Sequence, residues 1–177
     1  MTTQPATKTL SLPTAGTYRI DGVRSRVTYT SRHMFGLGKV RAEFSTASGL
    51  LEIAESLSEC RVLATIDAAS FKSDNAKRDR DVKGPGLLDV AQFPRIEFTS
   101  TEVREDGRGA VLIGLVAMHG VDAAVEVVVS SWEVQAPDQI HVLARADHLD
   151  RCSFGITGAR GWVGRYFDLA LDISAAR

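Results

Sequence analysis

The stretch ASFKSDNAKRDRDVKGPGLLDVAQFPRIEFTST, Ala69–Thr101, decides how this chain folds. Residues 62–68, just before it, alternate between apolar and polar side chains, which is the period of a half-buried strand. The charged middle predicts a helix over 74–83, because Ser, Asp and Asn offer N-caps and Gly84-Pro85-Gly86 cannot continue a helix. After Pro94 the chain is extended again. We therefore expect a short helix between two strands, as a lid at the end of a sheet.

Nearly every other segment from Tyr18 onward has the alternation of a strand. The clearest case is 167–173, where Phe, Leu, Leu and Ile alternate with Asp, Ala and Asp. Glu105-Asp106-Gly107 and Pro137-Asp138 are typical of hairpin turns. Many short strands joined by hairpins, with a single helical excursion, predict an all-β antiparallel sandwich or barrel.

The strand AVLIGLVAM, Ala110–Met118, is apolar on both faces. A strand of an antiparallel sheet with one face in water has a polar set on that face, so both faces here need an apolar environment. In a barrel of about eight strands, the inner set would line a ligand cavity and the outer set would meet the helix or a second subunit. In a sandwich, the same strand would lie in a core covered by a loop. The pattern alone favours neither.

The charged stretch also carries a specific set of residues. They are Ser70, Asn75, Arg78-Asp79, Val82-Lys83, Leu88-Asp89, Phe93-Pro94, Ile96, Phe98 and Ser100-Thr101. This set resembles the signature of the YceI-like family, lipocalin-like proteins that bind polyisoprenoid lipids. Further matches are Tyr18-Arg19-Ile20-Asp21, Ser25, Arg32-His33, Gly114-Leu115, His119-Gly120-Val121 and Phe154-Gly155-Ile156. Arg24 departs from the pattern, because the family usually has a histidine there.

The resemblance implies a lipocalin-like antiparallel β-barrel, and so favours the barrel over the sandwich. It implies that a long polyisoprenoid lipid, such as a polyprenyl phosphate or an isoprenoid quinone, is held in the barrel for storage, sequestration or transport. No catalysis is implied. Because family members are often dimers, we expect a homodimer, and a lipid carrier would make transient contact with a membrane surface.

Within such a barrel, we expect a set of apolar side chains from along the chain to form the cavity wall. They are Val27, Tyr29, Phe44, Ile66, Phe98, Leu112, Val116, Val142, Phe154, Ile156, Trp162 and Phe167.

Two polar residues are candidates for contact with the head group of the ligand. His33 stands just before a predicted turn, where it could bind a head group or simply cap a strand. Arg78 lies in the charged helix, and its guanidinium offers two parallel donors for a phosphate or quinone oxygen. The alternatives for Arg78 are a solvated helix with internal ion pairs, or an Arg–Asp clamp that holds the lid.

Composition limits the remaining possibilities. The length of 177 residues and the 44% hydrophobic content predict a single domain, over residues 17–177. Residues 1–16 are expected to form a flexible leader. A net charge of −1 gives no basic face for nucleic acid. The leader lacks the pattern of a signal peptide, and no apolar run approaches the ~20 residues that span a bilayer. We therefore expect a cytoplasmic protein.

Metal and disulfide chemistry are not expected. Cys60 and Cys152 lie far apart in the sequence, and two cysteines do not make a disulfide framework. His148, Asp150 and Cys152 alternate along one predicted strand but match no standard zinc spacing. The sequence therefore predicts free thiols, no metal and no cofactor.

Two other functions remain open. The first is an enzyme or isomerase that acts on a small apolar substrate, with His33 or His119 as the base. The second is a dimeric interaction module that binds no lipid and uses the apolar strand only for association.

Overall fold

The computed structural model describes residues 11–33, 37–45, 47–107 and 109–177, and of His33 only the backbone. The strands are β1 (Gly16–Ile20), β2 (Arg26–His33), β3 (Gly38–Phe44), β4 (Ala47–Ile53), β5 (Arg61–Asp67), β6 (Phe71–Ser73), β7 (Arg95–Glu105), β8 (Ala110–Met118), β9 (Val121–Ala136), β10 (Gln139–Asp150) and β11 (Val163–Ala176). The helical elements of the described part are α1 (Ala76–Lys83) and the 3-10 turns η2 (Leu57–Glu59), η3 (Ala68–Ser70) and η4 (Arg151–Phe154).

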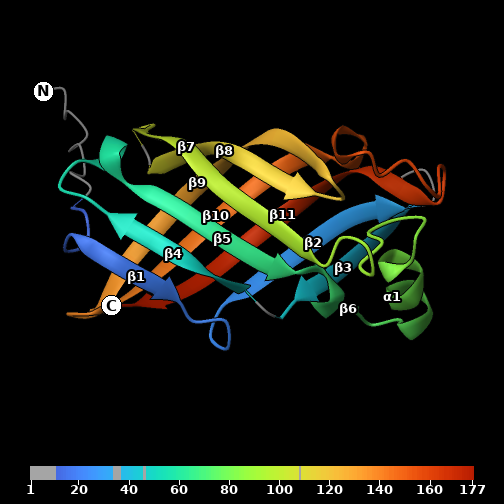
Figure 1. Ribbon diagram of the computed structural model, residues 1–177, viewed down its shortest axis with the longest axis horizontal. Coiled ribbons are helices and arrows are strands. Elements are labelled where there is room, and N and C mark those ends of the chain that lie inside the picture. Colours follow the sequence, from blue (N-terminus) through green and yellow to red (C-terminus); the bar gives the residue numbers. More distant parts are fainter. Residues whose placement is uncertain (1–10, 34–36, 46, 108) are drawn as a thin grey trace, which may run out of the picture.

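The strands close into an antiparallel barrel (Figure 1). Pairing runs β1–β4–β5–β7–β8–β9–β10–β11 and returns from β11 to β1 at Arg19–Ala176 and Ile20–Ala175. The sheet also continues from β11 through three further strands, because β11 pairs with β2, β2 with β3 and β3 with β6. The predicted eight-stranded lipocalin-like barrel is therefore confirmed, and the sandwich is excluded.

The helix predicted over 74–83 is confirmed as α1. The Asn75 side-chain oxygen accepts from the Arg78 backbone N–H at 2.9 Å, which satisfies a free donor of the first turn. The helix ends at Gly84, whose N–H donates to the Asp81 carbonyl at 3.3 Å. Figure 1 shows α1 at one end of the barrel, with the C-terminus at the other. The described part contains no helix long and apolar enough to cross a membrane.

Both predicted hairpin turns are present. Between β7 and β8, the Asp106 carboxylate accepts from the Gly109 N–H at 2.9 Å, and Gly107 has a φ of +78°, which glycine adopts without steric cost. Between β9 and β10, Pro137 and Asp138 join the strands.

The two apolar faces of strand β8 lie on opposite sides of the barrel wall. Leu112 and Val116 line the interior, while Ile113 and Leu115 belong to the outer set. Leu115 is 44% exposed. Helix α1 does not provide the cover that the sequence suggested, because it is bonded to β6 at the end of the barrel.

The end of the barrel opposite α1 is closed in part by residues before β1. The indole Nε1 of Trp132 donates to the Ser11 carbonyl at 2.9 Å, and Pro13 is buried. Of the leader expected over 1–16, residues 1–10 lie outside the described residues, and the rest is in contact with the barrel.

Candidate functional site: an apolar cavity with arginines at one end

A cavity of about 390 Å³ occupies the barrel interior. This volume lies within the ~300–1,000 Å³ of typical small-molecule sites. The inward-facing positions of the strands supply its wall, since alternate side chains of a strand point to the same face. Each of the twelve residues predicted for the wall lines it: Val27, Tyr29, Phe44, Ile66, Phe98, Leu112, Val116, Val142, Phe154, Ile156, Trp162 and Phe167. Which of them contact a ligand stays a prediction.

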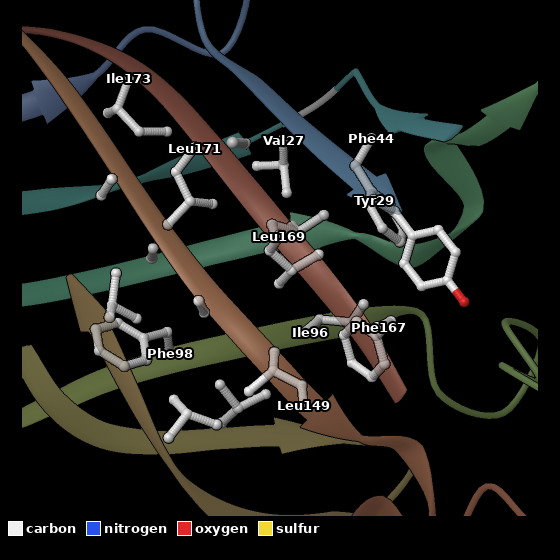
Figure 2. Close-up of a pocket in the computed structure, with 18 of the residues that line it drawn as sticks. Val27, Tyr29, Phe44, Ile96, Phe98, Leu149, Phe167, Leu169, Leu171 and Ile173 are labelled. Carbon is white, nitrogen blue, oxygen red and sulfur yellow. The ribbon is translucent and has the colours of Figure 1, made fainter. Parts of the chain in front are cut away.

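The interior surface consists mainly of aliphatic and aromatic side chains. Figure 2 shows Val27, Leu169 and Leu171 projecting into the space between the strands, with Phe98 on the facing wall. The Tyr29 hydroxyl lies at one end of this group (Figure 2). A long hydrocarbon chain is the kind of molecule that such a wall would bind, because each buried apolar Å² contributes about 25 cal/mol.

Sequence reasoning omitted several wall residues. Leu169, Leu171 and Ile173 follow Phe167 at every second position of β11, and all three line the cavity. The inward set of β9, which contains Val125, Val127 and Val129, was also missed. The signal was available, because the period of two that places Phe167 inside places its neighbours inside too.

Aromatic side chains cluster toward the end of the cavity that carries α1. The Tyr29 ring stacks on Phe167, with centroids 5.3 Å apart, and meets Phe71 edge-on at 5.8 Å. Trp162 is 72% exposed, so it lies at the rim rather than deep in the wall. Arg32, also exposed, lines the same cavity.

Arg78 lines the cavity but is already engaged with its own lid. Its Nε donates to the Ser73 hydroxyl at 3.0 Å, and its Nη2 pairs with the Asp74 carboxylate. Asp79 accepts from the Ser73 N–H at 2.9 Å and from the Ser73 hydroxyl at 2.5 Å. These bonds join β6 to α1, as the Arg–Asp clamp would, while Lys77 and Asp81 form an exposed ion pair within the helix, as the solvated-helix alternative would. The role of Arg78 stays a prediction. The His33 side chain lies outside the described residues.

A buried arginine that sequence reasoning missed also lines the cavity. Arg151 opens η4 and is only 5% exposed. Its guanidinium donates to three backbone carbonyls, those of Ile156 at 2.7 Å, Gly164 at 3.0 Å and Val163 at 3.3 Å. The sequence suggested that Arg151 simply continues a strand end, because nothing in the local pattern shows that η4 turns this residue into the barrel.

The positive charge of Arg151 influences the pKa of the Tyr29 hydroxyl. Burial raises the pKa of Tyr29 above its usual 10.0, and the Ser31 side chain and the positive charge of Arg151 partly offset that rise. A neutral phenol that can donate a hydrogen bond therefore lies within electrostatic reach of a buried cation.

The remaining histidines have partners away from the cavity wall. His119 has a φ of +54° in the β8–β9 turn, and its ring packs on Phe93 with centroids 4.8 Å apart. His141 Nε2 lies 2.8 Å from an Asp172 carboxylate oxygen, a partner that the sequence did not indicate. His148 stacks on Tyr166 at 4.0 Å.

The three residues weighed as zinc ligands are engaged separately. Asp150 accepts from Arg165 at 2.7 Å, while His148 stacks on Tyr166 and Cys152 is half-buried with a free thiol. Cys60 is also a free thiol, buried near η2. Within the described ranges, His, Cys, Asp and Glu side chains form no group of three that could hold a metal ion.

The chain is similar in sequence and in fold to known proteins. A family model described as the YceI-like domain matches residues 18–175. A UPF0312 protein of Yersinia pestis (strain Pestoides F) is 38% identical over 61 residues, which is 34% of this chain and 32% of that protein. The chain thus matches about a third of the length of this curated relative.

Two solved structures share the fold. The crystal structure of Burkholderia cenocepacia BcnA has a TM-score of 0.76 and 19% identity, over 89% of this chain and 99% of that one. A polyisoprenoid binding domain from Saccharophagus degradans, implicated in plant cell wall breakdown, has a TM-score of 0.66 and 13% identity, over 90% of this chain and 97% of that one.

Proposed function

We propose a lipid carrier function for this chain, which belongs to the YceI-like family. Its barrel would hold a polyisoprenoid lipid, either a polyprenyl phosphate or an isoprenoid quinone, with the tail in the apolar cavity. The observation that supports this proposal is the continuous apolar wall, to which the strands of the closed ring all contribute. The polyisoprenoid binding of the structural neighbour from Saccharophagus degradans supports the same ligand class.

The tail alone could supply the affinity. At ~0.3 kcal/mol per heavy atom, an isoprenoid tail of ~40 carbons would contribute ~12 kcal/mol, which corresponds to a dissociation constant near nanomolar. A polar contact would then set which head group is accepted more than whether the lipid binds.

Native mass spectrometry after mild purification, followed by organic extraction, tests this proposal. We expect a bound species of several hundred daltons or more that an organic solvent releases, and whose fragments have the repeating mass of isoprene units. A protein that stays empty after incubation with isoprenoid lipids would contradict the proposal. An empty dimer would favour the interaction module.

A binding role has more support here than the enzymatic alternative. Of the two histidines considered as bases, His119 is not among the residues that line the cavity and packs on Phe93. Turnover assays distinguish a carrier from an enzyme, because a carrier returns its isoprenoid ligand chemically unchanged.

The proposed homodimer would use the outer surface of the barrel. Leu63 of β5 and Leu115 of β8 are both 44% exposed, and the Thr99 backbone of β7 pairs with both. These two exposed leucines lie in one row, on either side of Thr99, and exposed apolar side chains favour association. Sedimentation at micromolar concentration should show a dimer, and the double variant Leu63→Glu, Leu115→Glu should be monomeric. A monomeric wild-type protein would contradict this part of the proposal.

Transient membrane contact would occur at the rim that carries α1. Leu37 is 88% exposed and Trp162 is 72% exposed. The residues that follow them, Gly38 and Val163, both pair with His33, so the two apolar side chains lie on neighbouring strand ends. Arg32 and Lys39 add exposed positive charge beside them. We expect the protein to co-sediment with vesicles that contain anionic lipid, and the variant Leu37→Ser, Trp162→Ser to remain in the supernatant. Equal sedimentation of the two proteins would contradict the contact.

A further inference from the structure

We infer that Arg151 is the head-group recognition residue of the cavity and that it selects an oxyanion, a phosphate or a carboxylate, over a neutral head group. This inference rests on the proposed function, because it supposes an isoprenoid tail in the same cavity. It refines that function by assigning the polar end of the ligand to the part of the barrel where Tyr29, Phe167 and Arg151 meet the cavity.

The charges on the cavity wall are all of one sign. Its charged residues are Arg32, Arg78 and Arg151, and no aspartate or glutamate is among the described residues that line it. Arg78 is paired with Asp74, and Arg32 is exposed to water. Arg151 is therefore the wall cation that is both buried and without a carboxylate partner among the described residues.

A neighbouring carboxylate is not available to Arg151. Asp150, the residue before it, accepts from Arg165 Nε at 3.0 Å and Nη2 at 2.7 Å, and from the Cys152 N–H at 2.9 Å. Arg165 is exposed and does not line the cavity. The adjacent acid is thus neutralised outside the barrel, and the positive charge of Arg151 remains inside it.

The guanidinium has donors to spare. An arginine side chain carries five N–H groups. Arg151 uses three of them, one on each nitrogen, for the carbonyls of Ile156, Gly164 and Val163. One N–H remains on each terminal nitrogen without a partner among the described residues. Carbonyl oxygens bring only partial charge, whereas buried cations are normally paired with an anion.

The surroundings favour an oxyanion at this place. Gly164 lies so close to β2 that a Cβ there would be 1.9 Å from the Arg32 carbonyl and 2.8 Å from the Ser31 hydroxyl. Arg151, bonded to Gly164, is thereby held beside β2, the strand that carries Tyr29. A phosphate or carboxylate here would neutralise Arg151 and accept from the Tyr29 hydroxyl. A quinone oxygen would leave the buried charge unbalanced, which is why we commit to the oxyanion.

The alternative role for Arg151 is purely structural, since its three carbonyl bonds fasten η4 to the start of β11. The two roles differ in what a variant does to different ligands. Loss of a structural bond weakens every ligand alike, whereas loss of a recognition charge weakens only the anionic ones.

The test compares four probes with tails of the same length: geranylgeranyl monophosphate, geranylgeranoic acid, geranylgeraniol, and a ubiquinone with four isoprene units. These short tails keep the head-group contribution visible. Binding to the delipidated full chain is measured by displacement of an apolar fluorophore. The variants are Arg151→Gln, which keeps one amide donor group beside the carbonyls but removes the charge, and the control Arg145→Gln, which changes an exposed arginine that pairs with Asp147 and does not line the cavity. Circular dichroism confirms that each variant is folded.

We expect the wild-type protein to bind the monophosphate or the acid roughly tenfold or more tighter than the alcohol and the quinone. Arg151→Gln should reduce this preference to within about threefold, and Arg145→Gln should keep the preference. The comparison of monophosphate with acid identifies which oxyanion is recognised.

Three results would overturn the inference: no preference in the wild-type protein, a preference that survives in Arg151→Gln, or an equal loss of all probes in that variant. If wild type binds the alcohol without preferring anions, only this inference fails. If it binds none of the probes, the proposed function fails as well. Should Arg151→Gln not fold, phosphorus NMR of the monophosphate bound to wild type replaces it: a second phosphate pKa below that of the free lipid supports the buried cation, and an equal or higher one overturns it.

Discussion

The Tyr29 ring lies 5.3 Å from the Phe167 ring, stacked at 30° between β2 and β11. These two strands are joined along seven residue pairs, and Ser31 pairs with Phe167 itself. The stack therefore marks a boundary inside the barrel. Toward the body of β11 the wall is aliphatic, with Leu169 and Leu171, and toward the start of β11 lie the carbonyls that hold Arg151. A ligand with one apolar and one polar end matches this division.

Filling the cavity with carbon should displace the ligand without unfolding the protein. Leu112→Trp places a larger apolar side chain in the tail path, where the extra volume can occupy space that the lipid would use. We expect most of the co-purified lipid to be lost, as measured by organic extraction and mass spectrometry. The matched control is Leu115→Trp on the outer face of the same strand, which should keep its lipid. Equal lipid in the two variants would show that the tail does not occupy this part of the barrel.

Removing the Arg78 side chain should affect the lid more than the ligand. Its Nε donates to Ser73 at 3.0 Å, and loss of that bond should lower the free energy of unfolding by about 1–2 kcal/mol. Most of the lipid should stay bound in Arg78→Ala. Lys77→Ala serves as the control, because Lys77 is exposed and its ion pair with Asp81 contributes little. Complete loss of lipid in a folded Arg78→Ala protein would instead make Arg78 the main head-group contact.

Gly164 should tolerate no side chain. A Cβ there would lie 1.9 Å from the Arg32 carbonyl, so Gly164→Ala forces β11 away from β2. We expect a loss of about 1–3 kcal/mol in the free energy of unfolding, measured in urea. Gly86→Ala is the control, since a Cβ at Gly86 meets no atom within 4 Å and should change stability by less than about 0.5 kcal/mol. Similar stabilities for the two variants would contradict the close packing of β2 on β11.

The Asp150–Arg165 pair should make stability depend on acid pH. The hydrogen bond from Arg165 holds the pKa of Asp150 below its usual 3.8, so the folded state binds this proton more weakly than the unfolded chain does. The stabilisation is therefore present above pH 3.8 and is lost as the pH falls through the lowered pKa.

Urea unfolding of wild type and Asp150→Asn tests this dependence. The wild-type advantage should be full near neutral pH and smaller at about pH 3. Arg165→Gln, which removes the main cause of the shift, should show a weaker acid dependence than wild type. An advantage of the same size at both pH values would mean that the pair does not set the titration of Asp150.

The sequence by itself determined which segments are strands and, on several of them, which face is apolar. Apolar alternation along β11 and the two apolar faces of β8 are local properties, readable without any partner strand. The end of α1 followed from the stop at Gly84, whereas the helix starts at Ala76, two residues after the predicted start at 74. A period of two also selects one face of a strand, which accounts for nine of the twelve residues expected on the wall; Phe154, Ile156 and Trp162 line the cavity from outside the strands.

Only the tertiary structure decided closure and the polar chemistry of the cavity. The pairing of β1 with β11 joins Ile20 to Ala175, and no local period encodes a contact across that separation. Arg151 becomes a wall residue because η4 turns it inward onto the carbonyls of residues 156–164. Arg78 reaches the same cavity but is bonded to Ser73 and Asp74 instead. Whether an arginine is paired or left as a buried charge depends on which groups the fold brings within hydrogen-bond distance, and that is settled only when the barrel has closed.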